Sequence, residues 1–164
     1  MTLETIAIRR ETPADLATIL YHRHAMFRDM GMPIKDDFRQ QHDALFDQWL
    51  REEVAAGRYL AWFAAVTDPG GAERIVAGAG LLYYDWIPNF IDGGQRRGYI
   101  LNVYTEPDYR GRGLARTLVE RCVDHCRAQG LRFVALHASA QGRPIYEQIG
   151  FTQTNEMRLT LMSE

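Results

Sequence analysis

Hydrophobic residues in this chain follow two spacings, one typical of strands and one typical of helices. Short apolar or alternating runs predict strands over 5–10, 59–67, 74–84, 99–105 and 131–138, and a last strand or strand pair over 150–162. The turn sequence Asp68-Pro69-Gly70-Gly71 lies between the second and third runs. We therefore expect these two runs to form a hairpin.

Helical spacing marks the segments between these strands. Thr12 and Pro13 begin a first helix, whose inner face continues to Gly31. The members of that face are Leu16, Ile19, Leu20, Arg23, Met26 and Phe27. A second helix is expected over 36–56. A long third helix begins at Leu114 and ends near Gly130, with Leu114, Leu118, Cys122 and Cys126 recurring every four residues.

The order of these elements is β-α-α-β-β-β-α-β-α-β. Antiparallel strands early in the chain and a β-α-β unit late in it predict an α+β fold with a central mixed, mostly antiparallel sheet flanked by helices. The chain has 164 residues, of which 46% are hydrophobic and 24% charged. This size and composition predict one globular domain over 1–164.

Charge and composition exclude several function classes. The formal net charge is -2 and the basic residues form no long run, so a nucleic-acid partner is not expected. No apolar stretch reaches the length of a membrane span and no signal sequence precedes the first strand, so we expect no membrane partner and a cytoplasmic location. Cys122 and Cys126 share the apolar stripe of a helix without further ligands nearby, so no metal is expected.

The joint between the strand at 99–105 and the long helix has the chemistry of an anion site. Pro107 ends the strand, and Arg110, Gly111, Arg112 and Gly113 follow directly before the helix. A helix N-terminus has unpaired N–H groups and a positive dipole end, glycines let the backbone approach an anion, and arginines add charge. The joint therefore predicts a phosphate-binding turn.

Three phosphate-loop patterns compete for this turn. The nucleotide P-loop fails because Leu114 and Ala115, not Lys and Ser or Thr, follow Gly113. The dinucleotide pattern is weak because Arg116 replaces its third glycine and no acid follows in 131–137. The pattern Arg/Gln-x-x-Gly-x-Gly/Ala is satisfied by Arg110, Gly113 and Ala115.

With this motif between a Val-x-Thr-x-Pro strand end and a long helix, the chain resembles the GNAT superfamily of N-acetyltransferases. The resemblance covers nearly the whole chain in order and is specific from about 99 to 151. It implies acetyl-CoA as cosubstrate, bound where the strand splays from its neighbour. It places the pantetheine arm along Val103, Tyr104 and Thr105, and the pyrophosphate at Gly111, Arg112, Gly113, Leu114, Ala115 and Arg116, with Arg110 at the first motif position.

A second motif of the same family follows the strand at 131–138. Ser139 matches its Asn or Ser at the strand end, Tyr146 its tyrosine on a short helix, and Gly150-Phe151 the residues after it. Pro144 departs from the pattern, but proline is tolerated in a first helical turn, so a helix start near 141–142 preserves Tyr146. The resemblance places Ser139 at the cofactor and makes Tyr146 the general acid that protonates the coenzyme A thiolate; the alternative is a ring that only packs.

The residues that receive the proton of the amine and bind the acceptor are left open. Asn102, Glu106, Asp85 and His137 are candidates for a base or water relay, and His137 is expected to be a buried core residue. The resemblance places the acceptor between the first two helices and the loop after the third strand. These segments contain Tyr21, Met26, Phe27, Met30, Met32, Phe38, Tyr84, Asp85, Trp86, Ile87, Asn89 and Phe90. Most of the apolar ones are expected to close the core.

The resulting hypothesis is direct acetyl transfer from acetyl-CoA to a primary amine of a small molecule, an amino acid or a peptide. Two alternatives stay open: a non-catalytic acyl-CoA-binding sensor or scaffold, and another anion-binding enzyme such as a nucleotide-dependent transferase. An uncovered edge strand would favour a homodimer.

Overall fold

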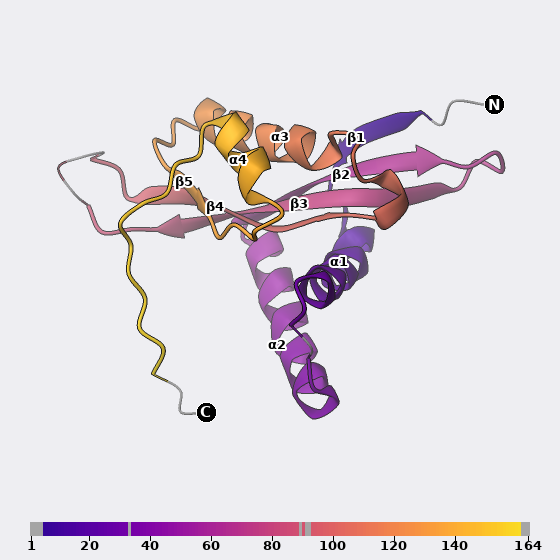
Figure 1. Ribbon diagram of the computed structural model, residues 1–164, viewed down its shortest axis with the longest axis horizontal. Coiled ribbons are helices and arrows are strands. Elements are labelled where there is room, and N and C mark those ends of the chain that lie inside the picture. The colour runs from indigo at the N-terminus through magenta and orange to yellow at the C-terminus, as the bar shows by residue number, and fades with distance from the viewer. Residues whose placement is uncertain (1–4, 33, 89, 91–92, 162–164) are drawn as a thin grey trace.

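A five-stranded sheet organises the chain, with helices on both of its faces (Figure 1). The computed structural model describes residues 5–32, 34–88, 90 and 93–161. The strands follow the sheet in chain order: β1 (Ile6–Arg10), β2 (Tyr59–Thr67), β3 (Glu73–Asp85), β4 (Arg96–Thr105) and β5 (Val134–Leu136). The first four pair antiparallel and β5 joins β4 in parallel, which confirms the predicted α+β fold with a mixed, mostly antiparallel sheet.

One pair of helices covers each face of the sheet. In Figure 1, α1 (Leu16–Asp29) and α2 (Asp36–Ala55) lie below it, and α3 (Leu114–Ala128) and α4 (Arg143–Ile149) lie above it. Two short 3-10 turns, η1 (Pro13–Asp15) and η2 (Pro107–Tyr109), lead into α1 and toward α3. In the described part of the chain, no helix is both long and apolar enough to cross a membrane.

Each face of the sheet has its own hydrophobic core. Toward α3, the sheet packs on Leu118, Val119, Cys122 and Cys126, all fully buried. A side chain on Gly98 of β4 would meet the Cys126 sulfur at 2.8 Å, so this glycine permits the close approach of α3 to β4. Toward α1 and α2, Ile19, Leu50, Tyr59 and Phe63 form the second cluster. Burial raises the pKa of Cys126 to about 11, as expected of a core thiol.

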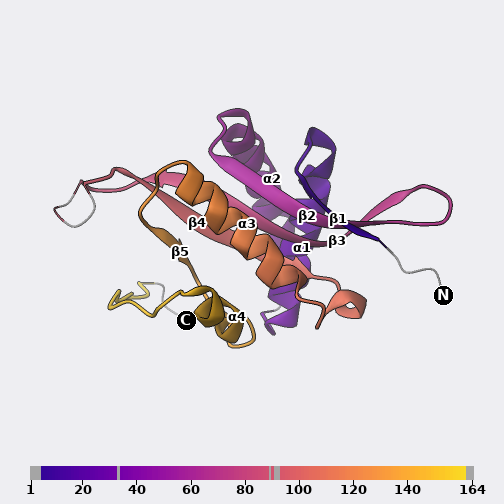
Figure 2. The ribbon, with the colours of Figure 1, turned by 90° about the horizontal axis from the view of Figure 1, so that it is seen from above.

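The last two strands share only a short stretch of pairing. Gly98, Tyr99 and Ile100 of β4 pair with Val134, Ala135 and Leu136, and β4 then continues to Thr105 without β5 beside it. Figure 2 shows β5 running away from β4 toward α4. The sheet is therefore open along the second half of β4.

The prediction of a strand within 150–162 is wrong for the described residues. Residues 150–161 contain no helix or strand, and Met162 lies outside the described part. Met157, Leu159 and Leu161 are 81–95% exposed, so their alternation has no face to pack against. A strand forms only with a partner, and β5 is three residues long instead of the eight predicted, so it offers almost no edge.

Candidate active site

The free edge of β4 is the first component of the site. Beyond Ile100, residues 101–105 have β3 on one side and no strand on the other. This half of β4 includes Val103, Tyr104 and Thr105, the residues assigned to the pantetheine arm from the sequence. The Thr105 carbonyl accepts a hydrogen bond from Arg110 Nε at 3.0 Å. An extended ligand could occupy this edge like an added strand.

A bulge at Asn102 lies at the start of this free edge. Asn102 has a φ of 54°, the left-handed conformation that asparagine tolerates better than most residues, and the register between β3 and β4 shifts there. Its buried side chain donates to the Tyr59 hydroxyl at 3.1 Å and accepts from Arg23 Nη1 at 3.1 Å. The bulge therefore turns the amide of Asn102 toward α1 and fixes it there.

The predicted anion-binding turn lies where β4 ends and α3 begins. Gly111 and Gly113 have φ values of 73° and 77°, and Gly113 caps α3. No acidic side chain lies in the first turn of α3, so its N–H groups face no competing carboxylate from that turn. A side chain on either glycine would meet no atom within 4 Å, so backbone conformation is what requires glycine.

The arginines of the turn are all engaged within the protein. Arg110 forms an ion pair with Asp29 at the end of α1. Arg112 donates to the Asp108 carbonyl at 3.0 Å, and Arg116 pairs with Glu120 at 2.9 Å. Leu114 is buried and Ala115 half-buried. The backbone amides of the turn, with the arginines as flanking charge, are thus the groups that could hold a diphosphate.

The second motif brings Ser139 and Tyr146 to one place. Ser139 Oγ accepts a hydrogen bond from the Gly142 N–H at 3.1 Å, which fixes the turn before α4. A side chain on Gly142 would lie 3.1 Å from the Tyr146 hydroxyl and 3.2 Å from Ser139 Oγ, so the glycine keeps the space between these hydroxyls open. Pro144 lies in the first turn of α4, as predicted. Burial raises the pKa of Tyr146, so the phenol keeps its proton at neutral pH.

The candidates for a base occupy different places. Asn102 is buried in the bulge, Asp85 ends β3 opposite Arg96, and Glu106 lines a cleft described below. The expectation that His137 is a core histidine is wrong: it is exposed, because β5 ends one residue before it. Its Nδ1 is hydrogen-bonded to the Tyr99 hydroxyl.

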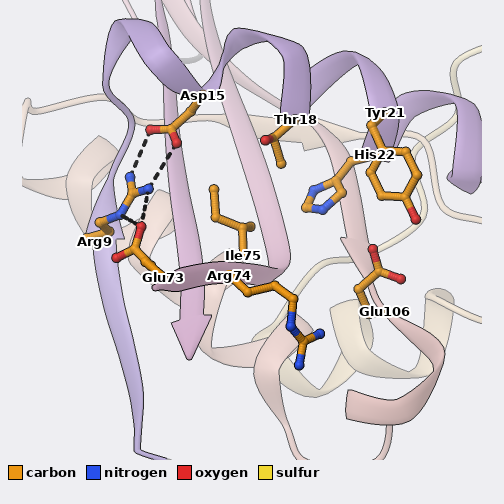
Figure 3. A pocket seen from close by; sticks show the side chains of 9 residues that line it. All are labelled: Arg9, Asp15, Thr18, Tyr21, His22, Glu73, Arg74, Ile75 and Glu106. Atoms are coloured by element: carbon orange, nitrogen blue, oxygen red, sulfur yellow. Dashed lines mark hydrogen bonds and ion pairs between the residues drawn. The ribbon is translucent and has the colours of Figure 1, made fainter. Parts of the chain in front are cut away.

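An open cleft of about 490 Å³ lies between α1 and the ends of β1, β3 and β4. Figure 3 shows Arg9 bonded to Asp15 and Glu73 at one end, and Glu106 facing Tyr21 at the other. His22 lies between them and is 1% exposed. Its burial lowers its pKa to about 4, so the imidazole is neutral at pH 7. Sequence reasoning did not single out His22.

The predicted acceptor segments present apolar side chains to solvent. Tyr21, Met30, Met32, Phe38, Trp86, Ile87 and Phe90 are 39–109% exposed, so the expectation that they close the core is wrong. Asn89 lies outside the described residues. Sequence reasoning also did not single out Arg23, which contacts Asn102 at the bulge, although the signal was present: a charged residue on the apolar face of a helix.

The described structure thus combines a free edge of β4 with a glycine-rich N-terminus of α3. The sequence profile of the acetyltransferase (GNAT) family matches residues 22–151, and the chain belongs to this family. Within the described residues, no group of three or more His, Cys, Asp or Glu side chains could hold a metal ion.

Named relatives are N-acyltransferases. The chain is 37% identical over 89 residues to glucosamine 6-phosphate N-acetyltransferase of Trypanosoma brucei brucei, an alignment that covers 54% of this chain and 58% of that protein. It is 28% identical over 117 residues to the L-amino acid N-acyltransferase MnaT of Escherichia coli (strain K12), covering 66% of each. The chain therefore spans about 58–66% of the length of these two relatives.

Solved structures match over almost the entire chain. A GCN5-related N-acetyltransferase from Ralstonia eutropha JMP134 is 32% identical with a TM-score of 0.83, covering 96% of this chain and 99% of that one. A predicted acetyltransferase from Clostridium acetobutylicum, solved with acetyl-CoA, is 27% identical with a TM-score of 0.84, covering 96% of this chain and 97% of that one.

Proposed function

We propose that this protein is an N-acetyltransferase that moves the acetyl group of acetyl-CoA directly to a primary amine of a small molecule or peptide. The observation that carries the proposal is the free edge of β4, which leads straight to the glycine turn before α3. A strand edge and a helix N-terminus in this order suit a ligand with an extended amide-bearing arm followed by a diphosphate. Acetyl-CoA has these two parts.

In this proposal each component holds one part of acetyl-CoA. The backbone of Val103, Tyr104 and Thr105 binds the pantetheine arm. The amides from Gly111 to Arg116 bind the diphosphate, and Arg110 holds the turn against the end of β4 through its hydrogen bond to the Thr105 carbonyl. Ser139 orders the opposite wall through Gly142. The thioester then lies near the bulge, where β4 and β5 separate.

The transfer needs one proton donor and one proton acceptor. The amine nitrogen attacks the thioester carbon, the carbon–sulfur bond breaks, and the sulfur leaves as a thiolate that takes a proton from the Tyr146 hydroxyl. Of the candidate bases, His137 has the most suitable position, because it follows the point at which β5 leaves β4. Its side chain is hydrogen-bonded to Tyr99. Because side chains alternate along a strand, Tyr99 points toward the face of the sheet that α1 and α2 cover. We propose that His137 takes the amine proton.

Thiol release is the decisive measurement. The protein is mixed with acetyl-CoA and a panel of primary amines, and free coenzyme A is followed with a thiol reagent. We expect acceptor-dependent release. Tight binding of acetyl-CoA without release for any amine would contradict the proposal and favour an acyl-CoA sensor or scaffold. A thermal shift by ATP or NAD, with none by coenzyme A, would instead favour a nucleotide-dependent enzyme.

A further inference from the structure

Arg23 of α1 lies beside the bulge, and its side chain is half-buried. Its guanidinium forms no ion pair with any residue that the structure describes, whereas Arg9 pairs with Asp15 and Glu73, and Arg110 with Asp29. Its Nη1 donates to Asn102, and its buried Nε finds no hydrogen-bond partner in the described part of the chain. Burial lowers the pKa of Arg23, although the group stays charged at neutral pH.

The surroundings of Arg23 stabilise a cation only in part. The guanidinium lies 5.0 Å from the ring centre of Phe27 and 4.6 Å from that of Phe46, one from each helix. Asp43, an acidic residue of α2, is bonded to His24 at 2.7 Å. A half-buried charge that faces aromatic rings and one amide has lost water without gaining a counter-ion. Such a group is arranged to receive an anion.

The position of Arg23 assigns that anion to the acceptor. Arg23 reaches the bulge through Asn102, on the α1 and α2 face of the sheet. The predicted diphosphate site lies at the start of α3, which covers the opposite face (Figure 1). The anionic groups of coenzyme A therefore have their own site. A second anion beside the bulge would belong to the molecule that approaches the thioester from the other face.

We infer that Arg23 binds a carboxylate or phosphate of the acceptor, so that the preferred substrates are small amines carrying an anionic group. This inference rests on the proposed function and specifies its substrate class. Guanidinium binds either anion through two parallel hydrogen bonds, and Asn102 occupies only Nη1. Its amide holds the guanidinium toward the bulge, so that Asn102 is a positioning residue for the acceptor.

The test compares matched amines that differ only in the anion. One arm uses an α-amino acid and its amide, and the other uses an amino-sugar phosphate and the free amino sugar. We expect the wild-type protein to prefer the anionic member in at least one arm, and the arm that responds identifies the anion. Arg23→Gln should lower kcat/KM for that member about 10- to 100-fold, mainly through KM, and leave the neutral member unchanged.

Two further variants separate recognition from folding. Arg23→Lys keeps the charge and should restore part of the preference. Arg51→Gln removes an exposed arginine of α2 that is paired with Asp47 at 2.8 Å, and it should leave the preference intact. Melting temperatures of all three variants should stay close to that of the wild-type protein. Equal use of anionic and neutral amines by the wild-type protein, or an equal loss for both in Arg23→Gln, would overturn the inference.

Calorimetry with the same amines in the presence of coenzyme A keeps the two proposals distinguishable. If the wild-type protein binds the anionic amine but releases no thiol, and Arg23→Gln abolishes this binding, the anion site is supported and acetyl transfer is contradicted. Thiol release with neutral amines alone supports acetyl transfer and contradicts the anion site.

Discussion

The Tyr99 hydroxyl is hydrogen-bonded to Nδ1 of His137 beside the last paired residues of β4 and β5. This bond connects the two strands on the side where they begin to separate. In the tautomer that carries its proton on Nδ1, the imidazole donates to Tyr99 and the Nε2 lone pair is available for a proton. The pair therefore has the arrangement of an oriented base.

His137→Gln should lower kcat/KM for an amine acceptor about 100-fold at neutral pH, because a positioned base contributes about that much. The loss should shrink as the pH rises, since more of the acceptor is then already deprotonated. Tyr99→Phe should cause a smaller loss, because it removes only the orienting bond. The measurement is thiol release from pH 6 to 9. A His137→Gln rate and pH profile equal to those of the wild-type protein would show that the proton leaves by another route.

Tyr146→Phe should lower kcat about 100-fold or more while the affinity for acetyl-CoA stays unchanged. The substitution removes the phenol proton but keeps the ring that lies 6.1 Å from Phe151. Tyr83→Phe is the matched control, because burial also raises the pKa of Tyr83. Its buried hydroxyl has no hydrogen-bond partner among the residues that the structure describes, and it lies outside the proposed site. If Tyr146→Phe kept a normal kcat, with or without a weaker affinity for acetyl-CoA, Tyr146 would be a packing residue and not the proton donor.

Gly113→Ala should lower the affinity for acetyl-CoA, measured by calorimetry, because it forces a left-handed φ of 77° on a residue with a Cβ. The strain of about 1–2 kcal/mol should tilt the amides that face the diphosphate. Gly71→Ala in the β2–β3 turn is the matched control, because it imposes the same type of strain at a φ of 85°. An added Cβ would meet no atom within 4 Å at Gly71 or at Gly113, so the two substitutions differ only in their place in the fold. Both variants should lose similar stability, but only Gly113→Ala should lose affinity. Equal affinity in both would place the diphosphate elsewhere.

Local sequence was sufficient to predict the elements that depend on local physics. The helix at 114–128 follows from its apolar spacing, and the left-handed turn before it follows from Gly111 and Gly113. The environment of Arg23 was not predictable, because its partner Asn102 lies 79 residues away in the chain. His137 was misplaced because its burial depends on how far β5 pairs, which the composition of one strand does not determine.

The buried His22 should make stability depend on pH between about 7 and 4. Its pKa is about 4 in the folded protein, against the ordinary histidine value of 6.5. As the pH falls below 6.5, the unfolded chain therefore binds a proton that the folded chain does not, and stability is lost until the pH reaches the folded value. At pH 5 the loss should be about 2 kcal/mol relative to pH 7.5.

Chemical denaturation of the wild-type protein and His22→Leu at pH 7.5 and pH 5 tests this dependence. The window lies above the ordinary titration range of carboxylates, so Asp15, whose pKa is held down by Arg9, contributes little there. His125, whose pKa burial also lowers, adds a loss of the same sign in both proteins, and the difference between the two pH slopes cancels it. Leucine cannot titrate, so His22→Leu should lose about 2 kcal/mol less than the wild-type protein between these pH values. Parallel slopes would mean that His22 accepts a proton within the fold, with the adjoining cleft admitting the water or anion that solvates it.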